Sequence, residues 1–116
     1  MTRLSIAQCE QAMAKGEFSP EVTASSSRVA IVLTQSWCPQ WVMMRLWLHQ
    51  AEKDAEASVF IMEYDKEAFF EDFMAFKEDV LGNRSVPYVR YYRDGKFTGD
   101  GNFTGRDGFV ARLTRL

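Results

Sequence analysis

The residues of this chain best suited to chemistry lie in the run Trp37-Cys38-Pro39-Gln40-Trp41. An apolar stretch precedes this run, and a pattern typical of a helix follows it. A cysteine at the start of a helix lies close to unpaired backbone N–H groups, which favour its thiolate form, and the thiolate is the nucleophile in disulfide exchange. Cys38 is therefore the candidate nucleophile. Trp41 occupies the position at which a neighbouring second thiol would resolve a mixed disulfide.

The other thiol and the two tryptophans each have more than one interpretation. Cys9 falls on the apolar face of a predicted helix, where a buried, unreactive thiol is favoured over a remote resolving thiol. Trp37 and Trp41 either belong to the core or form a partly exposed apolar rim around Cys38. Cys38 could itself be an inert, small apolar residue, although its place at a predicted helix start favours a reactive thiol.

Few other side chains suggest catalysis or metal binding. The only histidine, His49, falls in the middle of a predicted helix several turns from Cys38, which favours a surface position. The carboxylates of Glu63, Asp65 and Glu67 fall at a predicted strand end and helix start, and we do not expect them to form a catalytic pair. One histidine and two distant cysteines make no zinc-binding pattern. We therefore predict no metal site and no resident cofactor.

The composition fits one globular domain, which we assign to residues 1–116. Hydrophobic residues make up 47% of the sequence, and the formal net charge is -2. This charge gives no reason to expect a nucleic-acid or membrane partner. The apolar runs are too short to span a bilayer, and the N-terminal residues lack the apolar region of a signal peptide. Two cysteines make no disulfide framework, so we expect a cytoplasmic protein.

Alternating helices and strands are expected to position Cys38. Val29–Leu33 and Ser58–Tyr64 predict buried strands, because each contains a continuous apolar run with β-branched residues. Their strand–helix–strand order implies a parallel pair with a right-handed crossover. Tyr88–Tyr92 predicts a third strand, and Asp94-Gly95 predicts a two-residue turn into a return strand. The sequence further predicts helices at about residues 5–15, 39–55 and 66–80 and near the C-terminus, with a loop at about 19–27.

Three segments follow one another in an informative order. The first apolar strand leads into Trp37-Cys38-Pro39. Ser85-Val86-Pro87-Tyr88-Val89 comes later, and Arg93-Asp94-Gly95-Lys96 follows it. In this order and spacing the segments resemble the thioredoxin-like superfamily, with its Trp-Cys-Gly-Pro-Cys turn, its cis-proline segment and the turn between its last two strands. The resemblance implies an α/β thioredoxin-like fold, in which helices flank a central mixed β-sheet made of a parallel βαβ unit and an antiparallel C-terminal hairpin. It also implies a cis peptide bond before Pro87.

Three positions depart from the resemblance. Trp41 replaces the second, resolving cysteine of the family. The buried acid that is thought to move protons in dithiol chemistry falls at Val32, and the lysine that accompanies it falls at Ile61. All three changes remove parts that only a two-thiol cycle needs, so we do not expect an efficient general disulfide reductase. The Cys-Pro pair and the Ser-Val-Pro segment are also similar to glutaredoxins, which can work with one thiol and glutathione.

Together these features predict a one-thiol redox protein with Cys38 as the catalytic residue. Cys38 would attack a disulfide or a glutathionylated cysteine of a protein or peptide substrate. Glutathione or another low-molecular-weight thiol would then act as co-substrate and release the mixed disulfide. The alternative is a non-catalytic thioredoxin-fold protein-binding module. The oligomeric state stays open. The expected substrate-binding residues are Trp37, Pro39, Trp41, Val86 and Pro87.

Overall fold

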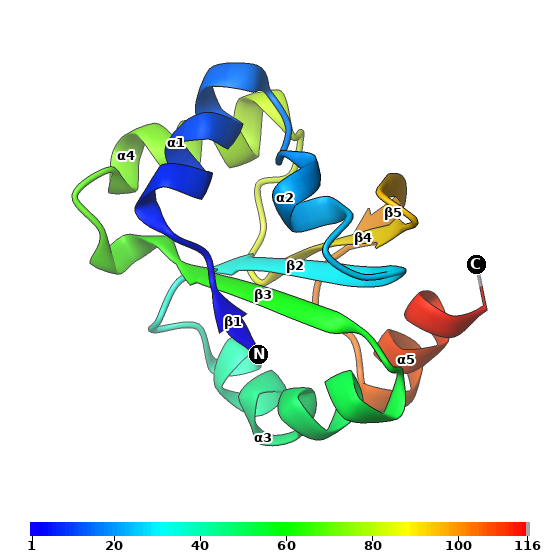
Figure 1. The fold of residues 1–116 in the computed structure, drawn as a ribbon. Helices are drawn as coiled ribbons and strands as arrows, with labels where there is room; N and C mark the ends of the chain where they lie inside the picture. The colour runs from blue at the N-terminus through cyan, green and yellow to red at the C-terminus, as the bar shows by residue number, and fades with distance from the viewer. Residues whose placement is uncertain (116) are drawn as a thin grey trace.

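A single five-stranded mixed sheet forms the centre of the protein in the computed structural model, which describes residues 1–115 (Figure 1). The strand order is β1-β3-β2-β4-β5. β1 and β2 both pair with β3 in parallel, whereas β4 runs antiparallel to β2 and to β5. This arrangement confirms the predicted parallel βαβ unit with an antiparallel C-terminal hairpin. The strands are β1 (Thr2–Arg3), β2 (Arg28–Thr34), β3 (Ser58–Glu63), β4 (Tyr88–Arg93) and β5 (Lys96–Gly101).

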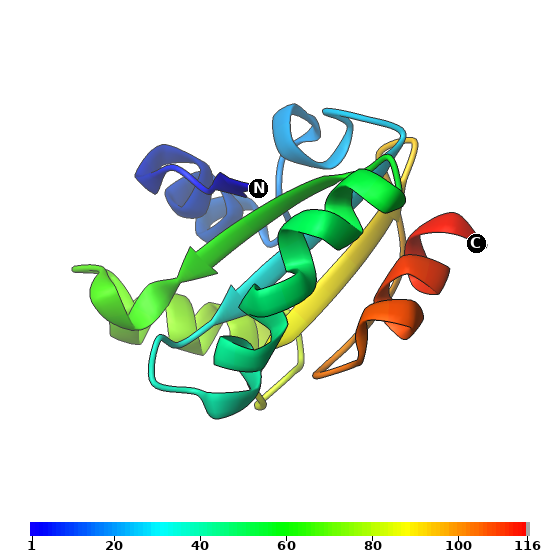
Figure 2. The same cartoon turned by 90° about the horizontal axis from the view of Figure 1, so that it is seen from below.

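Helices cover both faces of the sheet (Figures 1 and 2). α1, α2 and α4 lie on one face, whereas α3 crosses the other face with α5 beside it. Each face therefore has its own apolar core. The helical segments are α1 (Ile6–Lys15), α2 (Pro20–Thr23), α3 (Pro39–Asp54), the 3₁₀-helix η1 (Tyr64–Lys66), α4 (Phe70–Ala75), the π-helix η2 (Phe76–Val80) and α5 (Arg106–Thr114).

β2 is buried on both faces, as its continuous apolar run predicts. Val29, Ile31 and Leu33 point into the core beneath α1 and α4, and Ala30 and Val32 point into the core beneath α3. All five side chains are fully buried. Because side chains alternate along a strand, a strand that faces two apolar layers needs apolar residues at every position.

Local signals fix the ends of several elements. Ser5 Oγ accepts a hydrogen bond from the Gln8 N–H at 3.0 Å, and the Gln8 side chain accepts one from the Ser5 N–H at 2.9 Å, which forms the predicted capping box. Gly16 ends α1 in the left-handed conformation, with φ 82°. Asp94 and Gly95 also have positive φ angles, 51° and 80°. These angles are those of the tight turn that suits a twisted hairpin.

The fold differs from the sequence prediction in three places. β1 was not predicted, because two residues are too few to show an alternating pattern. The expected loop at 19–27 contains the one-turn helix α2, which begins at Pro20. The expected continuous helix at about 66–80 begins only at Phe70 and is divided into α4 and η2. Its last residue, Val80, is 60% exposed instead of buried. The wider π-helical turn, closed by the Leu81 N–H on Phe76 O, rotates Val80 away from the apolar face.

Candidate functional site

Cys38 lies at the N-terminal boundary of α3, in the connection that follows β2. Its backbone is extended (φ -69°, ψ 119°), and its carbonyl oxygen accepts a hydrogen bond from the Val42 N–H at 3.1 Å. Pro39 takes the first helical position, where a backbone N–H would have no helical partner. The predicted placement of the thiol at a helix start is therefore confirmed. The sulfur does not cap the helix, which leaves it available for other contacts.

The segment around Pro87 lies against this thiol. Cys38 Sγ is 3.6 Å from the carbonyl oxygen of Val86, to which the thiol donates a weak hydrogen bond. The Val86–Pro87 peptide bond is cis. Cys38 is 4% exposed, Pro87 is buried and Val86 is half-buried. The fold thus brings together two segments that are 48 residues apart in the sequence, and the sulfur lies directly against a backbone edge.

The two tryptophans beside the thiol have different environments. Trp37 is 64% exposed, and its indole N–H donates to Gln35 Oε1 at 2.6 Å. Trp41 is 1% exposed and packs in the core beneath α3. Its indole N–H donates to Glu63 Oε2 at 2.8 Å. The exposed rim that we considered for both residues is therefore wrong for Trp41, because the first turn of α3 directs its side chain at the sheet. Trp41 can position the helix but offers little surface to a partner.

Side chains of η1, which follows β3, hold the connection that carries Cys38. Asp65 accepts two hydrogen bonds from Ser36, from its N–H at 2.8 Å and its hydroxyl at 2.6 Å. Gln35 donates to the Tyr64 hydroxyl at 3.3 Å. Sequence reasoning missed these residues as parts of the site. The sequence did carry a signal for this contact. Ser36 follows β2 and Asp65 follows β3, and residues that follow two adjacent parallel strands emerge at the same edge of the sheet.

A pair of asparagines holds the opposite segment. The side-chain amides of Asn83 and Asn102 donate to each other's oxygens at 3.0 and 2.9 Å. Asn102 also donates to the Pro87 carbonyl at 3.0 Å, and Asn83 accepts from the Ser85 N–H at 3.0 Å. The sequence indicated only that Asn83 follows a helix end. These contacts fix the backbone next to the thiol. The connection that carries Cys38 and the segment around Pro87 are therefore both held by side chains that lie outside the predicted site residues.

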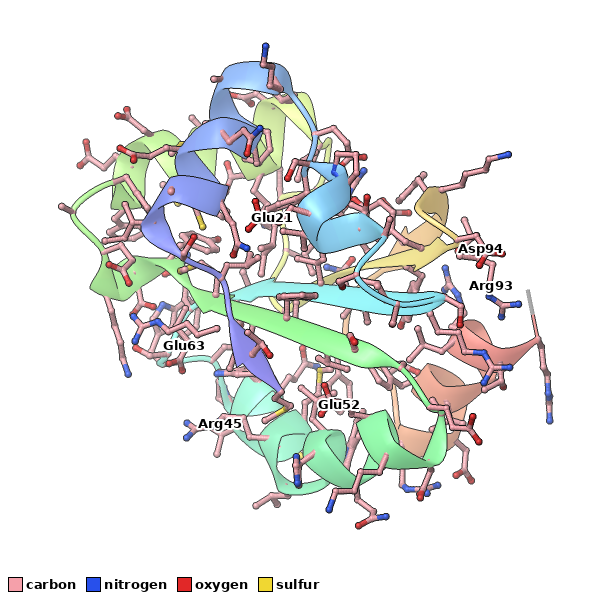
Figure 3. All side chains as sticks on the ribbon, in the orientation of Figure 1. Glu21, Arg45, Glu52, Glu63, Arg93 and Asp94 are labelled. Atoms are coloured by element: carbon pink, nitrogen blue, oxygen red, sulfur yellow. The ribbon has the colours of Figure 1, made fainter. Side chains whose placement is uncertain are left out.

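The sheet beneath the site is apolar. Val32 and Ile61 are directly paired in the register of β2 and β3, and both contribute to the core beneath α3. The nearest carboxylate along β3 is Glu63, which Figure 3 shows at the same end of the sheet as Arg45. Glu63 binds the Trp41 indole and pairs with Lys66 at 3.3 Å and Arg45 at 4.0 Å. At positions 32 and 61 the sheet beneath the thiol thus holds no ionisable group.

The other candidate side chains lie elsewhere. Cys9 is fully buried in the core beneath α1, on the face of the sheet opposite Cys38. Burial raises the pKa of the Cys9 thiol to about 12. The predicted burial of Cys9 is confirmed, and its low reactivity stays a prediction. His49 is exposed on α3, 3.9 Å from Glu52, which agrees with the surface position expected for it.

The described part of the chain, residues 1–115, contains no group of three or more His, Cys, Asp or Glu side chains arranged to hold a metal ion. None of the helices in the same range has both the length and the apolar composition needed to cross a membrane.

Comparison with known proteins identifies the fold. No protein-family model and no curated protein sequence matches the chain. Thioredoxin O1 from Arabidopsis thaliana, in its oxidised state, superposes with a TM-score of 0.71 at 13% identity, over 99% of this chain and 96% of that one. This chain has the thioredoxin fold.

Two further solved structures share the thioredoxin fold. A mutant thioredoxin from Halobacterium salinarum matches with a TM-score of 0.63 at 18% identity, over 83% of this chain and 82% of that one. A structure described for the thiol-resolving mechanism of the yeast mitochondrial 1-Cys peroxiredoxin, via the glutathione and thioredoxin systems, matches with a TM-score of 0.68 at 12% identity. It covers 100% of this chain and 95% of that chain. At these identities the matches establish the architecture.

Proposed function

We propose that the protein is a one-thiol redox protein that acts on protein or peptide disulfides and mixed disulfides through Cys38. The Cys38 thiolate attacks one sulfur of the substrate disulfide. A bond forms between Cys38 Sγ and that sulfur, and the other sulfur leaves as a thiolate. An external low-molecular-weight thiol, such as glutathione, then attacks the mixed disulfide and restores the Cys38 thiolate. This second step forms a disulfide between the external thiol and the sulfur released from Cys38. When that sulfur belongs to glutathione, the product is glutathione disulfide; when it belongs to a protein or peptide, a second external thiol completes the two-electron reduction.

The observation that carries this proposal is the contact between Cys38 Sγ and the Val86 carbonyl. A substrate chain that lies along this backbone edge can form β-type hydrogen bonds with it, which would align a substrate disulfide with the sulfur. In this proposal Val86 and Pro87 position the substrate, Trp37 supplies an exposed apolar contact and Pro39 shapes the entrance. We assign Trp41 a supporting role beneath the helix.

The positions of the two thiols favour an external resolving thiol over an internal one. Cys9 and Cys38 belong to different cores on opposite faces of the sheet, and both are free. A bridge between them would require the sheet to open, because disulfide geometry demands Cα atoms within about 7 Å. A reducing cytoplasm would supply the external thiol, and we place the protein there.

The test is turnover of a glutathionylated peptide in the presence of excess glutathione. We expect the wild-type protein and the Cys9→Ser variant to release the peptide thiol at the same rate, since Cys9 takes no part. Cys38→Ser should abolish this release and the trapping of a mixed disulfide, with an unchanged circular dichroism spectrum. Absence of turnover by the wild type, with either peptide or small disulfides, would refute the catalytic proposal and favour the non-catalytic binding module.

A further inference from the structure

A second surface feature lies on the face of the sheet opposite the core that contains Cys38. It is an open groove of about 590 Å³ lined by residues of α1, α4 and η2. Figure 1 shows α1 and α4 on the side of the sheet away from α3. The floor and walls of the groove are apolar. They consist of Met13, Ala14, Ala75, Phe76 and Val80.

Val80, on η2, adds exposed apolar surface to this groove. Because η2 rotates Val80 outward, a side chain that a regular helix would bury is 60% exposed here. Phe76, one turn earlier, is almost fully buried and forms part of the floor, where its ring meets that of Phe18 edge to face at 6.2 Å. At the end of α1, Gly16 comes close to Val80: a Cβ placed on Gly16 would lie 3.8 Å from Val80 Cγ1. The apolar lining of the groove is therefore held in place by α1 on one side and by η2 on the other.

The polar residues that line the groove all carry the same sign. They are Glu10 on α1, Asp72 on α4 and Asp79 on η2. Within the described residues, no cationic side chain lines the groove. Arg84 pairs with Asp79 at 2.9 Å and with Glu78 at 3.1 Å from outside it. The groove thus combines an apolar floor with a rim of carboxylates on both flanking elements.

We propose that this groove binds a short cationic amphipathic helix of a partner protein. The apolar floor matches the apolar face of such a helix, and Lys or Arg residues on either side of that face would meet the carboxylate rim. α1 has ten residues, which corresponds to a length of about 15 Å. A partner helix lying along it would place apolar residues at i, i+3 or i+4, and i+7 over the floor, with basic residues beside them. This inference is independent of the redox proposal, because no groove residue lies at the thiol site.

The binding test uses a synthetic helical peptide of leucine and lysine with leucines at i, i+4 and i+7, and a control peptide in which glutamate replaces lysine. Both peptides are titrated into the ¹⁵N-labelled protein. We expect the lysine peptide to shift backbone signals of α1, α4 and η2, and to bind more weakly as salt screens the carboxylates. The glutamate peptide should cause no shifts. Shifts that centre on the first turn of α3, or equal binding of both peptides, would overturn the proposal.

Matched variants separate groove binding from general attraction to an acidic protein. Asp72→Asn and Glu10→Gln should each weaken binding about 1.4- to 5-fold, the range typical of one exposed ion pair. Ala75→Gln fills the groove without changing its charge and should weaken binding further. Glu71→Gln removes an exposed carboxylate from the same helix outside the groove and should have no effect. An equal loss of binding for Glu71→Gln would contradict the proposal. NMR signals of the groove residues that shift with protein concentration alone would also contradict it, because they would identify a second copy of the chain as the occupant.

Discussion

Replacement of Glu17 by glutamine should leave the buried guanidinium of Arg90 without its carboxylate partner. The Arg90 side chain is 8% exposed, and its Nη2 donates to Glu17 Oε2 at 2.6 Å. Its Nε and Nη1 donate to the hydroxyls of Tyr92 and Tyr88 at 2.9 and 2.8 Å. Those hydroxyls in turn donate to Glu17 and Asp100, both at 2.7 Å. The network therefore holds one buried cation between two carboxylates, and only Glu17 contacts it directly.

The expected cost follows from the burial of the two partners. Removal of one partner from a fully buried ion pair costs about 3–5 kcal/mol. The Glu17 side chain is 42% exposed, so water screens part of the interaction and we expect Glu17→Gln to cost about 2 kcal/mol. Arg90→Met removes the charge itself, and both tyrosine hydroxyls keep their carboxylate acceptors. It also loses the stacking of the guanidinium on Phe97 at 4.2 Å, so we expect a change within about 1 kcal/mol.

A double-mutant cycle tests this reasoning. Unfolding of the wild type, both single variants and the double variant in urea, followed by circular dichroism, gives the four free energies of unfolding. We expect Glu17→Gln to cost about 2 kcal/mol in the wild type, and less than about 0.5 kcal/mol in the Arg90→Met background. An equal cost in both backgrounds would refute the argument, because it would show that the stability contributed by Glu17 does not depend on the buried cation.

Three further predictions concern the thiols, the tryptophan beneath the site and the tyrosines. A short iodoacetamide pulse at neutral pH should label Cys38 before Cys9. The pKa of Cys9 is raised to about 12, which leaves almost no thiolate at that residue. Labelling of Cys9 first, detected by mass spectrometry, would contradict this prediction. Trp41→Cys should allow a disulfide with Cys38 in the first helical turn, at a cost of about 3–5 kcal/mol for the emptied core. Insulin reduction should nevertheless stay slow, because Val32 and Ile61 provide no buried proton acceptor beneath the thiol. Rapid reduction would show that no such acceptor is needed. Burial raises the pKa of every tyrosine, so the folded state holds these protons more tightly than the unfolded state. The resulting stability is complete below about pH 10. It is lost as the pH rises from there to the raised pKa of each group, by at most about 1.4 kcal/mol per pH unit and group. Phenolate absorbance should therefore rise together with unfolding, and a phenolate signal at pH 10 from folded protein would count against this. The four tyrosines are Tyr64, Tyr88, Tyr91 and Tyr92.

The sequence by itself determined the features that depend on neighbouring residues. β2 was predictable because five consecutive apolar residues can be buried only between two layers. The capping box at Ser5 and the turn at Asp94-Gly95 were predictable because their hydrogen bonds and φ angles involve residues at most three apart. The same is true of Cys38 at a helix start, because Pro39 and the preceding strand fix that boundary locally.

Only the tertiary structure decided which groups surround these elements. The sequence pattern left Trp37 and Trp41 equivalent, but packing of α3 on the sheet buries one and exposes the other. The hydrogen bonds of Asp65 to Ser36 span 29 residues. The ion pair between Arg90 and Glu17 spans 73. Such contacts depend on how strands and helices are placed against one another, and no local periodicity encodes them, so they become visible only when the chain is folded.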